Sequence, residues 1–295
     1  MKIEKYEQLE KAVTAADMVL VGLGEEWVLT DEDIKADLEK KDIRLKVLIE
    51  VSEEKEIYAN VKSVLTAYYY KNYMPDRFKM AYENLFQLIK DKNYFIVSLS
   101  IDSYLKKIGF KEDRFVNPCG TYEKLQCDEG CDELGFEERI FVSDSVLMAE
   151  IKRFLDELGA VELSERNNVQ AILAKINDVL KSYSCGCCNS PLVFNYLGAK
   201  KYKEEGYLEN WKIYMKWLQG TLNRKLCVIE AGVGMKLPSV IRWPFEKTVF
   251  YNQKSEMFRI HEKFYQVNEE VSDRAYGCKS NSVNLFCDKK LEAFE

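Results

Sequence analysis

Histidine is almost absent from this 295-residue chain, in which His261 is the only one. A metal site made of several histidines is therefore excluded, and so is any mechanism that needs two imidazole groups. No apolar run approaches the ~20 residues that a membrane-spanning helix needs. The N-terminal segment MKIEKYEQLEKAV is charged and lacks the apolar core of a secretory signal peptide. We therefore expect a soluble, cytoplasmic protein that does not bind membranes.

Positively charged residues are also outnumbered by negatively charged ones. Lysine and arginine number 43 against 49 aspartates and glutamates, which gives a net charge of -6, and the sequence contains no basic stripe. This balance disfavours nucleic acid as a partner, because binding to its phosphates needs clustered positive charge. Hydrophobic residues make up 47% of the chain, as in globular proteins, and 295 residues suffice for one large domain with a smaller insert.

Short apolar segments that alternate with helical patterns determine the predicted fold. MVLV at 18–21 and YFIVS at 94–98 are typical of buried strands, as are the runs at 226–229 and 257–260. Such strands, interleaved with helices, predict an α/β fold with a Rossmann-like, mainly parallel sheet covered by helices on both faces. We expect a split sheet domain at 1–114 and 192–295, interrupted by a small cysteine-rich and helical module at 115–191.

The carboxyl ends of these strands carry the candidate binding residues. Ligands of such folds lie beyond those ends, where the sequence has Gly22, Gly24, Ser100, Asp102, Gly232, Gly234 and His261. Because glycine has no Cβ, the backbone N–H groups of a Gly-x-Gly turn can approach a pyrophosphate closely. The two glycine pairs therefore indicate a phosphate-binding edge.

Each of these signals has an ordinary structural alternative. Trp27 stands where the third glycine of a GxGxxG fingerprint belongs, and tight turns alone explain both glycine pairs. The carboxylates of Glu25 and Glu26 would repel a phosphate. His261 is either a ribose contact or simply an exposed residue at a strand end.

Six of the nine cysteines lie between Cys119 and Cys188. Without a secretory signal, such clustering indicates metal binding or thiol chemistry rather than a disulfide framework. Two close pairs, with the spacings Cys-x3-Cys and Cys-x2-Cys, match the paired knuckles of a structural zinc site, and they are formed by Cys127, Cys131, Cys185 and Cys188. The alternatives are that Cys187 replaces a neighbouring ligand, or that the thiols hold no metal.

Taken in chain order, these pieces resemble the sirtuin superfamily. YFIVSLSIDSYLKKIGF is similar to the family's strand-T-x-N-x-D-x-x-x-x-x-x-A-G-F element. FVNPCGTYEKLQC resembles the segment that carries the catalytic residue and the first zinc cysteine, and CGCC resembles the second zinc knuckle. The best match is AGVGMKLPSVIRWPFE, which is similar to E-L-G-V-G-x-N-T-P-x-I-I-x-x-P-F-E of the bacterial macrodomain-linked sirtuins, class M. The resemblance runs from Asp17 onward and is patchy between 25 and 90.

The resemblance implies a domain that binds NAD beside a module with one structural zinc ion. It implies cleavage of the nicotinamide–ribose bond and transfer of ADP-ribose to a protein, or to an acyl-lysine as in the deacylases. Ser100 and Asp102 would contact the nicotinamide ribose as catalytic and NAD-binding residues, and Cys119 would stand at the position of the general base. The remaining NAD-binding positions would be Gly22, Gly24, Gly232, Gly234 and His261.

The same positions depart from the family pattern. Ser100 replaces the catalytic-loop asparagine, Cys119 replaces the histidine or glutamine of the general base, and His261 replaces the ribose-binding asparagine. A thiol with the ordinary pKa of about 8.5 is a poor base, although it can act as a nucleophile that captures ADP-ribose. Three hypotheses follow: a divergent NAD-dependent ADP-ribosyltransferase or deacylase, a catalytically inactive sensor of NAD or ADP-ribose, and an interaction protein that has lost the nucleotide.

Overall fold

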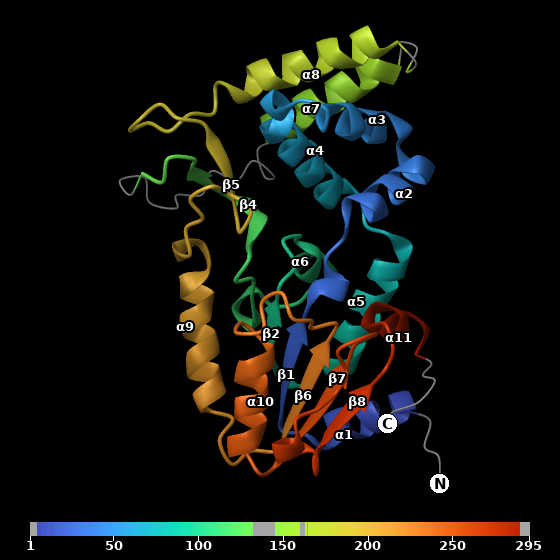
Figure 1. Ribbon diagram of the computed structural model, residues 1–295, viewed down its shortest axis with the longest axis vertical. Coiled ribbons are helices and arrows are strands. Elements are labelled where there is room, and N and C mark those ends of the chain that lie inside the picture. Colours follow the sequence, from blue (N-terminus) through green and yellow to red (C-terminus); the bar gives the residue numbers. More distant parts are fainter. Residues whose placement is uncertain (1–4, 132–144, 160–162, 164, 290–295) are drawn as a thin grey trace.

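Six parallel strands form the central sheet of the protein (Figure 1). The computed structural model describes residues 5–131, 145–159, 163 and 165–289. The sheet has the order β3-β2-β1-β6-β7-β8 and consists of β1 (Met18–Leu23), β2 (Asn93–Ser98), β3 (Phe115–Val116), β6 (Leu226–Ala231), β7 (Ser255–Ile260) and β8 (Ala275–Cys278). The predicted α/β fold with a mainly parallel sheet is confirmed.

Helices cover both faces of the sheet, which explains why its central strands are continuously apolar. In β1, Val19 and Val21 belong to the core on one face, whereas Met18 and Leu20 belong to the core on the other. The first core includes residues of α1 (Lys5–Ala15), α5 (Asp76–Ile89) and α11 (Ser282–Asp288). The second includes residues of α9 (Glu205–Gln219) and α10 (Arg242–Tyr251).

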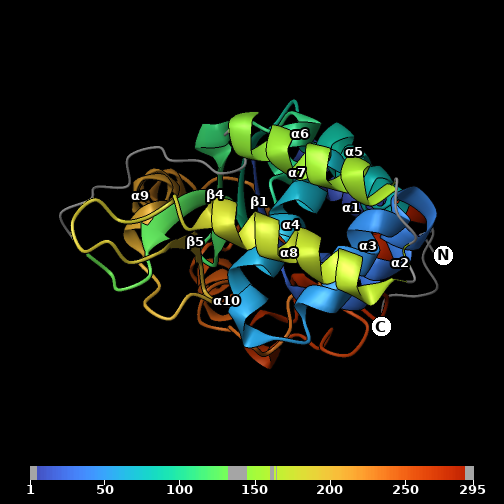
Figure 2. The same ribbon diagram turned by 90° about the horizontal axis from the view of Figure 1, so that it is seen from above.

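A second group of elements lies beyond the carboxyl end of the sheet (Figures 1 and 2). Its helices are α2 (Asp31–Lys41), α3 (Ile43–Ser52), α4 (Ala59–Asn72), α7 (Ser145–Gly159) and α8 (Arg166–Leu180). Beside them, β4 (Gly120–Cys127) pairs with β5 (Leu192–Tyr196) in an antiparallel sheet. The short helix α6 (Tyr104–Ile108) follows β2, and 3-10 turns occupy Glu25–Trp27, Glu56–Tyr58, Glu112–Arg114 and Glu269–Val271.

Contacts between these elements bear on the predicted division of the chain. Helices α3 and α4, which precede residue 115, pack against α7 and α8. Strand β5 begins at Leu192 and pairs with β4 from the 115–191 segment. The division into 1–114 with 192–295 and an inserted 115–191 module stays a prediction, and its parts at 1–4, 132–144, 160–162, 164 and 290–295 lie outside the described residues. Every helix in the described ranges is too short or too polar to cross a membrane.

A buried ionic network joins β6 and β7, near their carboxyl ends, to α10. Arg259 donates from Nε to Glu230 Oε2 at 2.6 Å and from Nη2 to Oε1 at 3.1 Å. Both side chains are fully buried, and Arg259 also contacts Glu246 of α10 at 2.8 Å. Nearby, Arg242 donates to the carbonyl oxygens of Val233 at 3.2 Å, Phe264 at 2.9 Å and Gln266 at 3.2 Å. The two arginines therefore fix the loops that follow β6 and β7.

Candidate functional site

The topology places a switch point between β1 and β6, where folds of this kind have their ligand crevice. From β1 the chain continues to β2 on one side of the sheet, whereas from β6 it continues to β7 on the other side. The two strands are hydrogen-bonded neighbours, so their following loops diverge at a topological switch point. In open parallel sheets, ligands bind in the crevice beyond such a point. This edge is therefore the candidate site on architectural grounds.

Two glycine turns meet at this crevice. Gly24 N–H donates to Ala231 O at 2.9 Å, and a Cβ on Gly24 would lie 2.2 Å from Gly232 O. Gly232 has a φ of +68°, and a Cβ there would lie 2.5 Å from Glu26 Cβ. Gly22 lies inside β1, where its missing Cβ makes room for Ile241. The close approach of the chain segments thus explains these glycines without a ligand, and their role in binding one stays a prediction.

Glu25 and Glu26 bridge the loops around the crevice. The Glu25 carboxylate accepts hydrogen bonds from Gly234 N–H at 2.5 Å and Lys236 N–H at 3.1 Å. Glu26 accepts from the N–H and hydroxyl of Ser282 at 2.6 and 2.7 Å, and from Glu262 N–H at 3.0 Å. The sequence suggested only that these carboxylates would repel a phosphate. Except for the Ser282 hydroxyl, their partners are backbone N–H groups far along the chain, for which no residue pattern provides a signal.

His261 lies at the end of β7 and is only 8% exposed, so the alternative of an exposed residue is wrong. Its Nδ1 accepts hydrogen bonds from Lys263 N–H at 2.9 Å and Phe264 N–H at 3.2 Å. Burial lowers the pKa of the imidazole, although the nearby Glu26 opposes this effect. The ring is therefore neutral near pH 7 and carries its proton on Nε2, and the 3.4 Å approach of Nδ1 to Glu26 is not an ion pair in that state.

Ser100 and Asp102 form a buried polar pair beyond β2. The Ser100 hydroxyl donates to the Asp102 carboxylate, which also accepts Tyr104 N–H at 2.8 Å. Asn117 donates to the Ser100 carbonyl at 2.7 Å and holds this turn against the start of β4. Burial raises the pKa of Asp102 to about 6, despite hydrogen bonds that favour the anion. The fully buried Tyr82 hydroxyl has no hydrogen-bond partner among the described residues.

Cys119 lies in an apolar wall of the site. It is 6% exposed and belongs to the same core cluster as Leu99 and Val233. Burial raises the pKa of its thiol to about 11, and the negative charge of Glu25 adds to the increase. Cys119 is therefore a neutral thiol near pH 7. A role as base or nucleophile would need a thiolate, which this environment disfavours.

The four predicted zinc cysteines come together. The sulfur atoms of Cys127, Cys131, Cys185 and Cys188 all lie within 4.8 Å of one another. The Cys127 and Cys188 sulfurs are 3.5 Å apart, and tetrahedral zinc with S–Zn bonds of ~2.3 Å would hold its sulfurs ~3.8 Å apart. The donor set and its spacing fit one zinc ion. Cys187 is exposed and lies outside this group. The structure therefore favours the four predicted cysteines over a ligand set in which Cys187 replaces one of them.

Comparisons with known proteins agree with this geometry. No family model matches the chain. A protein ADP-ribosyltransferase from Staphylococcus aureus is 20% identical over 292 residues, covering 92% of this chain and 83% of the relative. A probable bifunctional ADP-ribose hydrolase/ADP-ribosyltransferase from Fusarium oxysporum f. sp. cubense is 24% identical over 157 residues, which are 52% of this chain and 23% of that protein. The solved structure of a mutant Sir2 homologue complexed with 2'-O-acetyl ADP ribose matches with a TM-score of 0.51 at 10% identity, over 96% of this chain and 94% of that one.

The chain has the sirtuin fold. The resemblance drawn from the strand ends and the cysteine pairs is thus confirmed at the level of the fold. Membership of the macrodomain-linked class stays a prediction.

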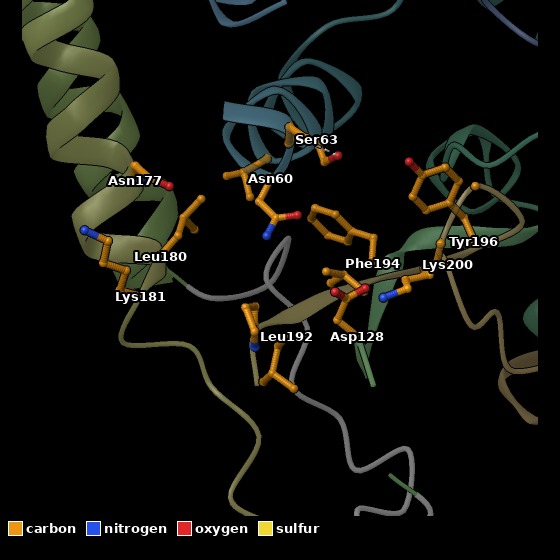
Figure 3. Close-up of a pocket in the computed structure, with 16 residues that line it drawn as sticks. Asn60, Ser63, Asp128, Asn177, Leu180, Lys181, Leu192, Phe194, Tyr196 and Lys200 are labelled. Atoms are coloured by element: carbon orange, nitrogen blue, oxygen red, sulfur yellow. Dashed lines mark hydrogen bonds between the residues drawn. The ribbon is translucent and has the colours of Figure 1, made fainter. Parts of the chain in front are cut away.

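A separate cavity of about 250 Å³ lies away from the sheet edge (Figure 3). Asn60 and Ser63 of α4 line it together with Asn177 of α8 and Phe194 of β5. It contains none of the residues that the sequence predicts for the site. This cavity is therefore separate from the candidate site at the carboxyl edge of the sheet.

The raised pKa of Asp102 predicts how stability depends on pH. Its pKa is about 6 in the folded protein and 3.8 for an ordinary aspartate, so the folded state binds more protons than the unfolded chain between these values. The contribution of Asp102 to stability therefore increases as the pH falls through 6 toward 4, and ionised Asp102 destabilises the fold at pH 8. We expect Asp102→Asn to raise the free energy of unfolding at pH 8 by ~1–3 kcal/mol, with the gain vanishing near pH 4.

Urea unfolding at both pH values measures this effect. Asp91→Asn, at an exposed position next to β2, is the matched control for loss of one charge. A gain at pH 8 that persists unchanged at pH 4, or a loss of stability at pH 8, would contradict the assignment.

Proposed function

We propose that this protein binds NAD in the crevice between β1 and β6 and transfers its ADP-ribose group to a protein acceptor. The observation that carries the proposal is the convergence of the predicted residues on one edge of a sirtuin-type sheet. Similarity to proteins named as ADP-ribosyltransferases, over 92% of the chain in the Staphylococcus aureus case, supports transfer to a protein more than deacylation. We further infer that the chain is nearest to the macrodomain-linked class, and that it acts in the cytoplasm.

The proposed residues have distinct tasks. NAD, when bound, supplies an ADP-ribosyl group whose bond to nicotinamide breaks during transfer. Asp102, fixed by Tyr104 N–H and Ser100, would orient the ribose next to that bond. The apolar wall of Cys119, Leu99 and Val233 would exclude water, which otherwise competes with the acceptor. Gly22, Gly24, Gly232, Gly234 and His261 would border the phosphates and the adenosine.

A specific observation favours a second candidate function. Cys119 stands at the general-base position, yet the pKa of its thiol is raised to about 11. An acceptor hydroxyl near pH 7 would find no base at this position. The protein would then bind NAD or ADP-ribose as a sensor without turning it over.

Calorimetric titration with NAD, followed by a nicotinamide-release assay on the same sample, tests these functions. We expect saturable binding and slow release near pH 7, with release abolished in Asp102→Ala and retained in Cys119→Ala, because the neutral Cys119 thiol only lines the apolar wall. Cys287→Ala, which removes a half-buried thiol on α11, is the matched control and should keep full release. Binding without release would support the sensor, and absence of binding would overturn both functions.

We also propose that Cys127, Cys131, Cys185 and Cys188 hold one structural zinc ion. The ion would link the end of β4, at Cys127, to the segment that precedes β5. Metal analysis should give a zinc-to-protein ratio of about one, and Cys185→Ser should lose the metal and lower the melting temperature. Cys187→Ser, one residue from a ligand but outside the group, should retain the ratio. Zinc retained in Cys185→Ser, or lost in Cys187→Ser, would contradict the ligand set.

A further inference from the structure

The carboxylate of Glu25 occupies a backbone cradle in the loop after β6. Its two oxygens accept Gly234 N–H at 2.5 Å and Lys236 N–H at 3.1 Å. Gly234 permits this approach, since a Cβ there would lie only 3.1 Å from Glu25 Oε2. Backbone N–H groups that converge on one anionic group are a common way for proteins to bind anions, phosphate included. The loop is therefore an anion site whose occupant belongs to the chain itself.

The contact spans the crevice where a ligand of this fold is expected. Glu25 lies in the turn that follows β1, and Gly234 lies in the loop that follows β6. The carboxylate therefore bridges the two sides of the switch point. Burial and then the charge of Glu25 raise the pKa of the Cys119 thiol to about 11. A diphosphate bound to Gly234 and Lys236 N–H would meet the Glu25 carboxylate there, and the negative charges would repel each other.

If Glu25 served only to fix the turn at 25–27, its hydrogen bonds would duplicate others that already fix this turn. Glu26 joins the same turn to Ser282 and to Glu262. Trp27 is fully buried and donates from Nε1 to Ser282 Oγ at 3.1 Å. The turn is thus anchored without the Glu25 carboxylate, whose hydrogen bonds among the described residues all come from the loop after β6.

We propose that Glu25 is an intramolecular competitor for the phosphate groups of the nucleotide, and that a ligand must displace its carboxylate from Gly234 and Lys236. This inference rests on the proposed binding of NAD in the same crevice. The chain holds its own site closed, and the affinity for a diphosphate is lowered by a charge that a single substitution removes. Glutamine at this position keeps the shape and one acceptor oxygen but loses the charge.

Calorimetric titration with NAD compares wild type, Glu25→Gln and Glu32→Gln. We expect Glu25→Gln to bind NAD at least ~10-fold more tightly, which corresponds to ~1.4 kcal/mol. Glu32→Gln removes one charge from an exposed position on α2 and should leave the affinity unchanged. If wild type binds NAD, equal or weaker binding in Glu25→Gln would overturn the proposal, because a carboxylate that only braces the loop would behave in this way.

A second titration separates this inference from the proposed function. Inorganic pyrophosphate is added to ¹⁵N-labelled protein, and the amide signals of Gly234 and Lys236 are followed. Saturable shifts of both signals in Glu25→Gln, at concentrations that leave wild type and Glu32→Gln unchanged, support the competitor even when NAD does not bind to any variant. That combination would reject the NAD function alone. If neither pyrophosphate nor NAD affects Glu25→Gln, the competitor is rejected as well.

Discussion

Glu230 and Arg259 lie side by side on β6 and β7, withdrawn from water, and two hydrogen bonds join them at 2.6 and 3.1 Å. A buried ion pair adds little net stability, but removing one partner typically costs ~3–5 kcal/mol, because the other charge is left uncompensated. The pair therefore acts as a constraint on geometry. Through Arg242, which donates to the carbonyls of Val233 and Phe264, the same charged region determines where the loops after β6 and β7 lie. The position of Gly234 N–H, and with it the contact that Glu25 makes across the switch point, depends on this network.

The crevice combines a ligand-binding architecture with charges that oppose a nucleotide. Ligands of open parallel sheets bind at such a switch point, and the two close glycine turns and the buried Ser100–Asp102 pair lie at the same edge of the sheet. Glu25 fills the anion cradle, and burial keeps Cys119 protonated near pH 7. Both features result from the positions that the fold gives to a glutamate and a cysteine. For the proposed transfer of ADP-ribose, they favour slow or regulated turnover over rapid turnover.

Much of this fold was readable in the sequence, for identifiable reasons. Strands buried on both faces are uninterrupted apolar segments, so β1, β2, β6 and β7 were found from residue type alone. The four-cysteine cluster was predicted because the two cysteines of each closely spaced pair can both reach one metal ion. The packing of α3 and α4 against α7 and α8 was not predicted, because an amphipathic pattern shows that a face is buried but not against what.

The polar contacts of the site were the least predictable part. Glu25 meets Gly234 only because β1 and β6 are neighbours in the sheet, and its partners are backbone N–H groups that every residue except proline carries. His261 was left open between a ligand contact and an exposed position, because exposure depends on loops that fold over the strand end. The raised pKa of Asp102 likewise results from burial, which a local motif does not reveal.

Hydrogen–deuterium exchange with and without NAD tests most directly that the nucleotide occupies the crevice between β1 and β6. The account predicts slower exchange of the segments 22–28, 98–104 and 231–237 when NAD is present, with no change at 59–64 and 191–200, which line the separate cavity. Protection of the cavity segments instead, or of none of these segments at saturating NAD, would contradict it.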